Sequence, residues 1–103
     1  MKLSDLKALG AFVDGTPVQK KVKIGDTETE VGVVKLSFAE AMKIQDDEKL
    51  LRYPNFIAKC IVFEGGEKMT YAQACKLDTP TVQAFLEAIG EVNGTAPKDE
   101  AEV

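Results

Sequence analysis

The chain has 103 residues, 45% of them hydrophobic and 29% charged, which fits one globular domain and is too short for two ordinary ones. Its net charge of −4 and pI near 4.8 argue against nucleic-acid binding, because a basic stripe would be needed to neutralise phosphates. No apolar run approaches the roughly 20 residues that cross a bilayer, and no secretion signal begins the chain, so we expect a cytoplasmic protein that does not bind membranes.

The first predicted element is a short helix near the N-terminus. Ser4 is its expected N-cap, because a serine side chain accepts a hydrogen bond from a free helical amide. Residues 5–9 would be helical, and Gly10 would end the helix in left-handed backbone geometry. The run Asp14–Pro17 then has the composition of a turn.

Two strands, residues 18–24 and 27–34, are predicted to form an antiparallel hairpin around Gly25-Asp26. A two-residue turn fixes the register, because the residues that flank it, Ile24 and Thr27, must pair. The alternation of side chains along a strand then decides which residues share a face.

This register gives the hairpin one charged face and one mostly apolar face. On the apolar face Lys20 lies opposite Val31, and its aliphatic stem would extend along the sheet edge. Each oppositely charged pair on the other face would stabilise the hairpin by roughly 0.2–1 kcal/mol. The pairs are Lys23 with Glu28, and Lys21 with Glu30.

A second helix is predicted to begin after Ser37. Ser37 and Glu40 have the spacing of a capping box, in which each side chain bonds the other residue's backbone amide. The helix would carry Phe38, Ala41 and Met42 on one side and weaken near residues 46–47.

The segment 48–63 fits two descriptions. Leu50, Tyr53, Ile57 and Ile61 have helical spacing, with Asn55 as a candidate N-cap just after Pro54. Residues 56–63 are also consistent with a buried strand, followed by a turn at 64–67. The helix is favoured, and the strand stays open.

Two further helices are expected in the last third of the chain. Thr70 would cap a helix over residues 71–77, and Thr79 would cap the next, with Pro80 at its first position. Asn93-Gly94 would end this last helix. Its apolar stripe is favoured as core over a partner-binding groove by about three to one; the stripe comprises Val82, Phe85, Leu86, Ile89 and Val92.

The predicted fold class is therefore α+β. Residues 1–94 would form a single domain in which the antiparallel hairpin packs against three or four helices. Residues 95–103 would form a flexible acidic tail or linker, because they contain almost no apolar residue.

The residue types that carry catalysis are scarce. There is no histidine, which removes the commonest general base and most transition-metal sites. Ser4 and Ser37 are favoured as helix caps over nucleophiles by about ten to one. Neither acidic cluster, 46–48 nor 99–100, has the spacing of a calcium loop or an acid/base pair.

The two cysteines, Cys60 and Cys75, lack the spacing of a zinc site or a redox pair. Buried free thiols are favoured over a bridge by about five to one, because the cytosol keeps thiols reduced. We therefore assign no catalytic, cofactor-binding or metal-binding residue and expect a non-enzymatic protein-binding module. The sequence does not identify the residues that face a partner.

The C-terminal half has a recognisable order of segments. An apolar segment, 52–63, is followed by an acidic-glycine turn and short helix, and then by a helix that closes on Asn93-Gly94. In this order, over residues 50–97, the chain resembles the tail assembly chaperones of long-tailed phages. The hairpin and the overall size are compatible with that resemblance, which rests on segment order and turn residues because the family has no catalytic signature.

The resemblance implies a role in tail morphogenesis in the host cytoplasm. Proteins of this kind bind the tape measure protein, recruit the major tail tube protein, and are absent from the mature virion. Coating a rod also implies self-association, so a homo-oligomer is expected. Many members have a longer frameshifted form, and a junction of that kind would lie after Gly94.

Two other interpretations remain open. One is a minor structural or head–tail joining phage protein, which would stay in purified particles. The other is a small cytoplasmic inhibitor or adaptor that binds a single protein target.

Overall fold

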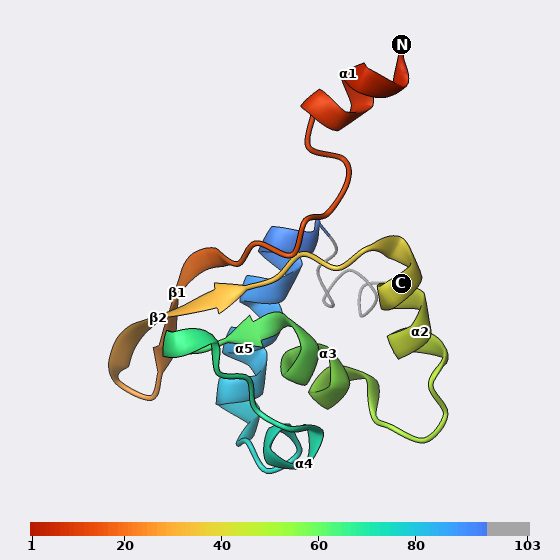
Figure 1. The fold of residues 1–103 in the computed structure, drawn as a ribbon. Coiled ribbons are helices and arrows are strands. Elements are labelled where there is room, and N and C mark those ends of the chain that lie inside the picture. Colours follow the sequence, from red (N-terminus) through yellow and green to blue (C-terminus); the bar gives the residue numbers. More distant parts are fainter. Residues whose placement is uncertain (95–103) are drawn as a thin grey trace, which may run out of the picture.

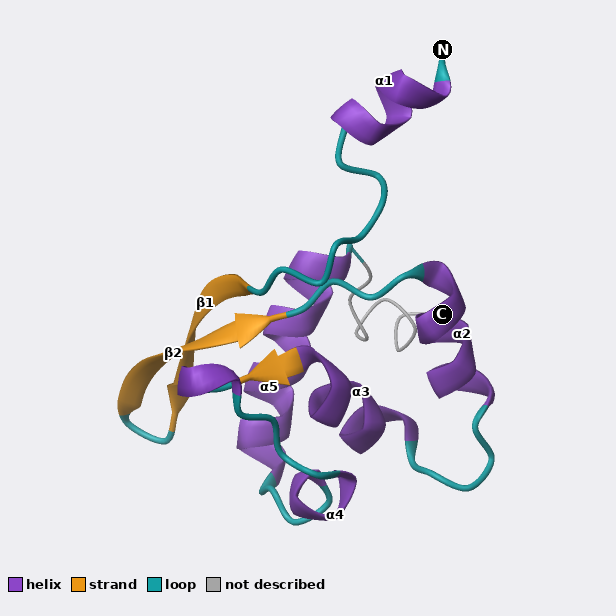
Figure 2. Ribbon diagram, in the orientation of Figure 1, coloured by secondary structure: helices purple, strands orange, loops and turns teal. Residues whose placement is uncertain are grey.

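Five α-helices and a three-stranded antiparallel sheet make up residues 1–94, the part of the chain that the computed structural model describes (Figures 1 and 2). The predicted α+β class is confirmed. The predicted acidic tail, residues 95–103, lies outside the described residues.

The predicted hairpin is confirmed in its register. Strand β1 (Val18–Ile24) pairs with β2 (Thr27–Val33), from Ile24 opposite Thr27 at the turn to Val18 opposite Val33 at the far end. Gly25 adopts a φ of 62°, which the two-residue turn requires and which a residue with a side chain rarely adopts.

A third strand, β3 (Ile61–Val62), extends this hairpin into a sheet of order β1-β2-β3. Val62 pairs with Gly32 and Ile61 with Val33, and the Val34 N–H donates to the Cys60 carbonyl at 2.8 Å. A strand of two residues leaves no alternation in the sequence, which is why the hairpin prediction did not include it.

The ambiguous segment contains both structures that its sequence allowed. Helix α3 (Arg52–Cys60) runs directly into β3, so the favoured helical interpretation is confirmed for residues 56–60 and the strand for the two that follow.

The start of α3 differs from the prediction, because Asn55 is not the N-cap. Leu51 is the N-cap, the Asn55 N–H donates to its carbonyl at 3.1 Å, and Asn55 is buried. Pro54 lies in the first helical turn, where amides have no partner within the helix and a proline loses no bond. Tyr71 fixes this helix start, since its hydroxyl accepts from the Leu51 N–H at 2.8 Å.

Helix α2 (Phe38–Asp46) begins with the predicted capping box. The Glu40 N–H donates to Ser37 Oγ at 3.2 Å, and the Ser37 N–H donates to Glu40 Oε1 at 3.1 Å. Phe38, one of the three apolar residues predicted to share a side of this helix, is 81% exposed, whereas Ile44 is buried. The two residues lie about 120° apart around the helix, so they cannot both face α3.

A single-turn 3-10 helix, η1 (Glu64–Gly66), forms the predicted acidic-glycine turn. Helix α4 (Tyr71–Ala74) follows, and its predicted N-cap is confirmed, because Thr70 Oγ1 accepts from the Gln73 N–H at 3.1 Å. The helix ends at Ala74, three residues before the predicted end at Leu77.

Helix α5 (Thr79–Asn93) begins one residue earlier than predicted. Asp78 is its N-cap and accepts from the Thr81 N–H at 3.0 Å, which moves Thr79 to the first position and Pro80 to the second. A carboxylate is favoured here because the amides at a helix N-terminus carry partial positive charge. The predicted end is confirmed, with Gly94 at a φ of 77°.

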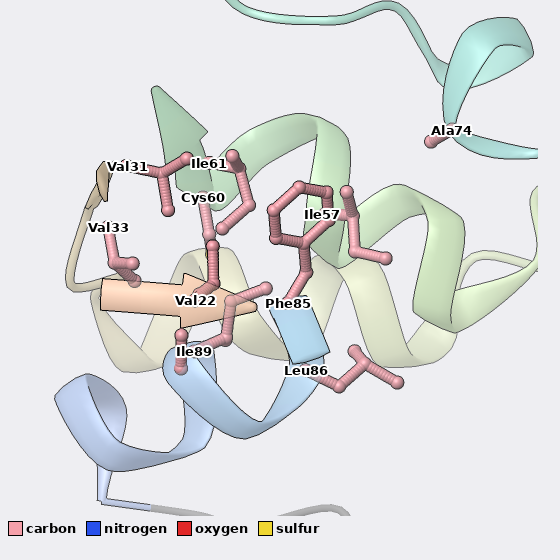
Figure 3. Packing of buried hydrophobic residues seen from close by; sticks show 11 residues of the cluster. Val22, Val31, Val33, Ile57, Cys60, Ile61, Ala74, Phe85, Leu86 and Ile89 are labelled. Atoms are coloured by element: carbon pink, nitrogen blue, oxygen red, sulfur yellow. The ribbon is translucent and has the colours of Figure 1, made fainter. Parts of the chain in front are cut away.

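The core lies between the sheet and two helices, with α5 packed against β1 and α3 (Figure 3). The interpretation of the α5 stripe as core is confirmed, since three of its members are buried and the other two pack against the cluster. The largest fully buried side chains are Ile57, Ile61, Val33 and Cys60.

Helix α1 (Leu3–Ala8) lies apart from the sheet and the other helices (Figure 1). Its predicted N-cap, Ser4, is wrong: Lys2 occupies the cap position, and its N–H donates to Asp5 Oδ2 at 2.8 Å. Asp5 thus lies three residues after the cap and bonds the backbone amide of the cap residue, as the acidic residue of a capping box does. Gly10 ends the helix as predicted, at a φ of 75°.

Candidate protein-interaction surfaces

The N-terminal arm, defined as residues 1–12, exposes most of its apolar side chains. Seven large apolar side chains are exposed among residues 1–94, and four of them belong to the arm. No residue of α1 is buried. The four are Met1 at 91% exposure, Leu3 at 63%, Leu9 at 72% and Phe12 at 57%.

Both ends of α1 are capped by residues of the arm itself. At the N-terminus Asp5 accepts from the Lys2 amide. At the C-terminus the Gly10 N–H donates to the Lys7 carbonyl at 3.0 Å and the Ala11 N–H to the Leu6 carbonyl at 3.4 Å. These two bonds around a left-handed glycine are a Schellman motif. A helix of six residues is marginally stable in water on its own. Helix α1 therefore depends on these caps, because it does not gain stability from packing on the body.

The helix is amphipathic. Leu3, Leu6 and Leu9 recur every third residue and so cover an arc of about 120°. Asp5 and Lys7 lie on the rest of the circumference. The arm therefore presents one apolar side to its surroundings.

The junction between arm and sheet is ordered by local contacts. The Thr16 N–H donates to Asp14 Oδ1 at 2.9 Å, and this bond lowers the pKa of the Asp14 carboxyl. Pro17 then lies against the backbone of β2, where a Cβ at Gly32 would come within 2.9 Å of the Pro17 Cβ. The absence of a side chain at Gly32 therefore sets where the arm leaves the sheet.

The body, defined as residues 18–94, offers a different surface. Its exposed large apolar side chains are Val18, Phe38 and Leu51, which lie on separate segments. A cleft of about 440 Å³ lies between β2 and η1, and Glu30 and Glu64 are among the residues that line it. At the other edge of the sheet, Lys20 of β1 forms an ion pair with Glu91 of α5 at 3.1 Å.

The two cysteines are free in this structure, as predicted, but only one is buried. Cys60 is fully buried, and burial raises the pKa of its thiol to about 12, so it is an unreactive core residue. Cys75 is exposed at the end of α4, which corrects the expectation that both thiols are buried.

The other candidates from the sequence have structural positions. Ser37 bonds Glu40 in the capping box, which lowers the pKa of the Glu40 carboxyl. In the acidic cluster, Asp47 accepts from the amides of Lys49 and Leu50 and so orders the turn before α3. Residues 1–94 contain no group of three or more side chains placed to hold a metal ion. None of the helices in this range is long and apolar enough to cross a bilayer.

Asn93 has a structural role that the sequence did not indicate. Its Oδ1 accepts from the Leu36 N–H at 2.8 Å, and its Nδ2 donates to the carbonyls of Ile89 at 3.0 Å and Val34 at 3.4 Å. These bonds tie the segment between β2 and α2 to the end of α5. The Asn-Gly pattern predicted only a helix end, which Gly94 alone supplies.

A family model described as "Phage tail assembly chaperone, TAC" matches residues 4–93. The chain belongs to this family. The match to the tail assembly chaperones begins within α1 and ends at Asn93, so it includes most of the arm as well as the body. It also covers the hairpin, beyond the C-terminal half on which the resemblance rested. No curated protein and no solved structure matches the chain.

Proposed function

We propose that this tail assembly chaperone binds the tape measure protein and recruits major tail tube subunits during tail assembly. It acts in the host cytoplasm, without catalysis, and is absent from the mature virion. The family match over residues 4–93 is the observation that carries the proposal.

The distribution of apolar side chains supports a binding role. The body builds its core from the sheet, α3 and α5, and the arm contributes no buried residue to it. The arm's exposed leucines are therefore available to cover apolar surface on another protein. A tape measure protein before tube assembly is a long rod with such surface, and many copies of a weak binder can cover it by avidity.

Co-expression tests the proposal directly. The tape measure protein of the same phage is expressed with and without the full-length chaperone, and its soluble fraction and bound chaperone are measured. We expect soluble tape measure protein that carries several copies of the chaperone, and we expect added tube subunits to bind this complex better than bare tape measure protein. A tape measure protein that is equally soluble alone and retains no chaperone would contradict the proposal.

Quantitative mass spectrometry of purified virions tests the predicted absence from the particle. The expected amount is far below one copy per tail. A stoichiometric amount would favour a structural or head–tail joining role instead.

A further inference from the structure

We propose that the N-terminal arm is the element that contacts the tape measure protein, by packing Leu3, Leu6 and Leu9 against an apolar stripe on a long α-helix. This inference rests on the proposed function and assigns residues to it.

The arm's chemistry fits a helical partner. Its three leucines lie on one side of a capped helix, and residues one helical turn apart are those that pack into the grooves of a second helix. The polar residues lie on the rest of the circumference, so one side of the arm can bind while the other stays in water.

A second copy of the chain is a poorer occupant. A helix of six residues is about 9 Å long and about 10 Å wide, so it buries far less than the ~800 Å² per partner of a stable protein pair. The described residues of another copy also expose few large apolar side chains outside the arm, namely Val18, Phe38 and Leu51 on separate segments. Neither the area nor the receiving surface suits a dimer held by the arm.

Because a single arm buries only a small area, stable binding requires a partner that offers many copies of the same binding surface. A single arm binds weakly, but copies lined along one rod share a single large partner, and their contacts add to a stable complex. Residues 13–17, which connect the arm to β1 and contain no helix or strand, span up to about 17 Å. Bodies of neighbouring copies then need not fit tightly against the rod.

The test compares two double variants of the full-length protein. The arm variant carries Leu3→Asp and Leu9→Asp, and the matched control carries Phe38→Asp and Leu51→Asp, which alter equally exposed apolar residues of the body. Each is co-expressed with the tape measure protein of the same phage, and the chaperone that copurifies is quantified. We expect the arm variant to lose binding by roughly tenfold or more, because losses at each weak contact multiply along the rod. The control is expected to bind within about twofold of the wild type.

Far-ultraviolet circular dichroism and urea unfolding confirm that each variant is folded, and light scattering gives its oligomeric state without tape measure protein. Wild-type binding from the arm variant would overturn the inference and leave the proposed function intact. A change in the arm variant's oligomeric state with unchanged tape measure binding would assign the arm to a second copy and also overturn it. No binding by the wild type would refute the proposed function itself.

Discussion

The arm and the body use the same kind of side chain in opposite ways. In the body, leucine, isoleucine and valine side chains fill the space between the sheet, α3 and α5, and the core residues are less than a tenth exposed. In the arm, Leu3 and Leu9 are more than half exposed, and Figure 1 shows that α1 lies apart from the body. Apolar content alone therefore does not tell a core from a binding surface.

The difference lies in what each segment depends on. The body's helices are stabilised by tertiary packing, as Ile57 and Phe85 show in Figure 3, whereas α1 depends only on its own caps. Substitutions in the two regions should consequently separate into those that affect folding and those that affect binding.

The largest loss of stability is expected for a substitution at the centre of the body. Ile57 is fully buried, so Ile57→Ala should lower the free energy of unfolding by about 2–5 kcal/mol through lost burial and a cavity. Urea unfolding followed by circular dichroism measures it. A loss below about 0.5 kcal/mol would mean that the body is not packed as described.

The next effect is expected at Asn93, which holds three backbone groups. Asn93→Ala would leave the Leu36 amide without its acceptor and should cost about 1–3 kcal/mol. Asn93→Asp, which keeps the acceptor and loses the donor, should retain part of the stability. Equal unfolding curves for wild type and Asn93→Ala would show that water replaces these bonds at no cost.

A smaller, pH-dependent effect is expected at Asp78. Bonds from the Thr81 side chain and backbone lower the pKa of its carboxyl below the ordinary value of 3.8. The ionised form therefore stabilises α5 above that pH, and this contribution is lost as the pH falls through the lowered pKa. We expect Asp78→Asn to have a lower Tm than the wild type near pH 6, with the gap closing toward pH 3. A gap that is constant with pH would contradict the role of the charge.

The smallest effect on stability is expected in the arm. Leu3→Ala with Leu9→Ala should change the free energy of unfolding by less than about 0.5 kcal/mol, because neither side chain is buried. The same urea experiment measures it, with Ile57→Ala as the contrast. A loss of 2 kcal/mol or more would mean that the arm packs on the body in solution.

Local signals predicted most of the body. The Gly25-Asp26 turn gave the full strand register, and the capping residues Ser37 and Thr70 gave two helix starts, because each depends only on neighbours in the sequence. Two helix starts were missed. At Asp78, two adjacent residues compete for the cap position, and at Leu51 the hydrogen-bond partner is Tyr71, which is distant in the sequence.

The exposed apolar surface of the arm could not be predicted from such local signals. The spacing of Leu3, Leu6 and Leu9 is visible in the sequence, but whether such residues are covered depends on where the rest of the chain lies. The strand β3 and the contacts of Asn93 were missed for the same reason, since both join residues far apart in the sequence.

Gly32, on β2, affects the position of the segment that connects the N-terminal arm to the sheet. A Cβ at this position would come within 2.9 Å of the Pro17 Cβ and within 3.3 Å of the Val62 carbonyl oxygen, so the closest neighbour that would have to shift is Pro17. A side chain at Gly32 is therefore expected to displace the segment that connects the arm to β1. The direction in which the arm leaves the sheet therefore depends on the absence of a side chain at Gly32, fifteen positions after Pro17 in the sequence.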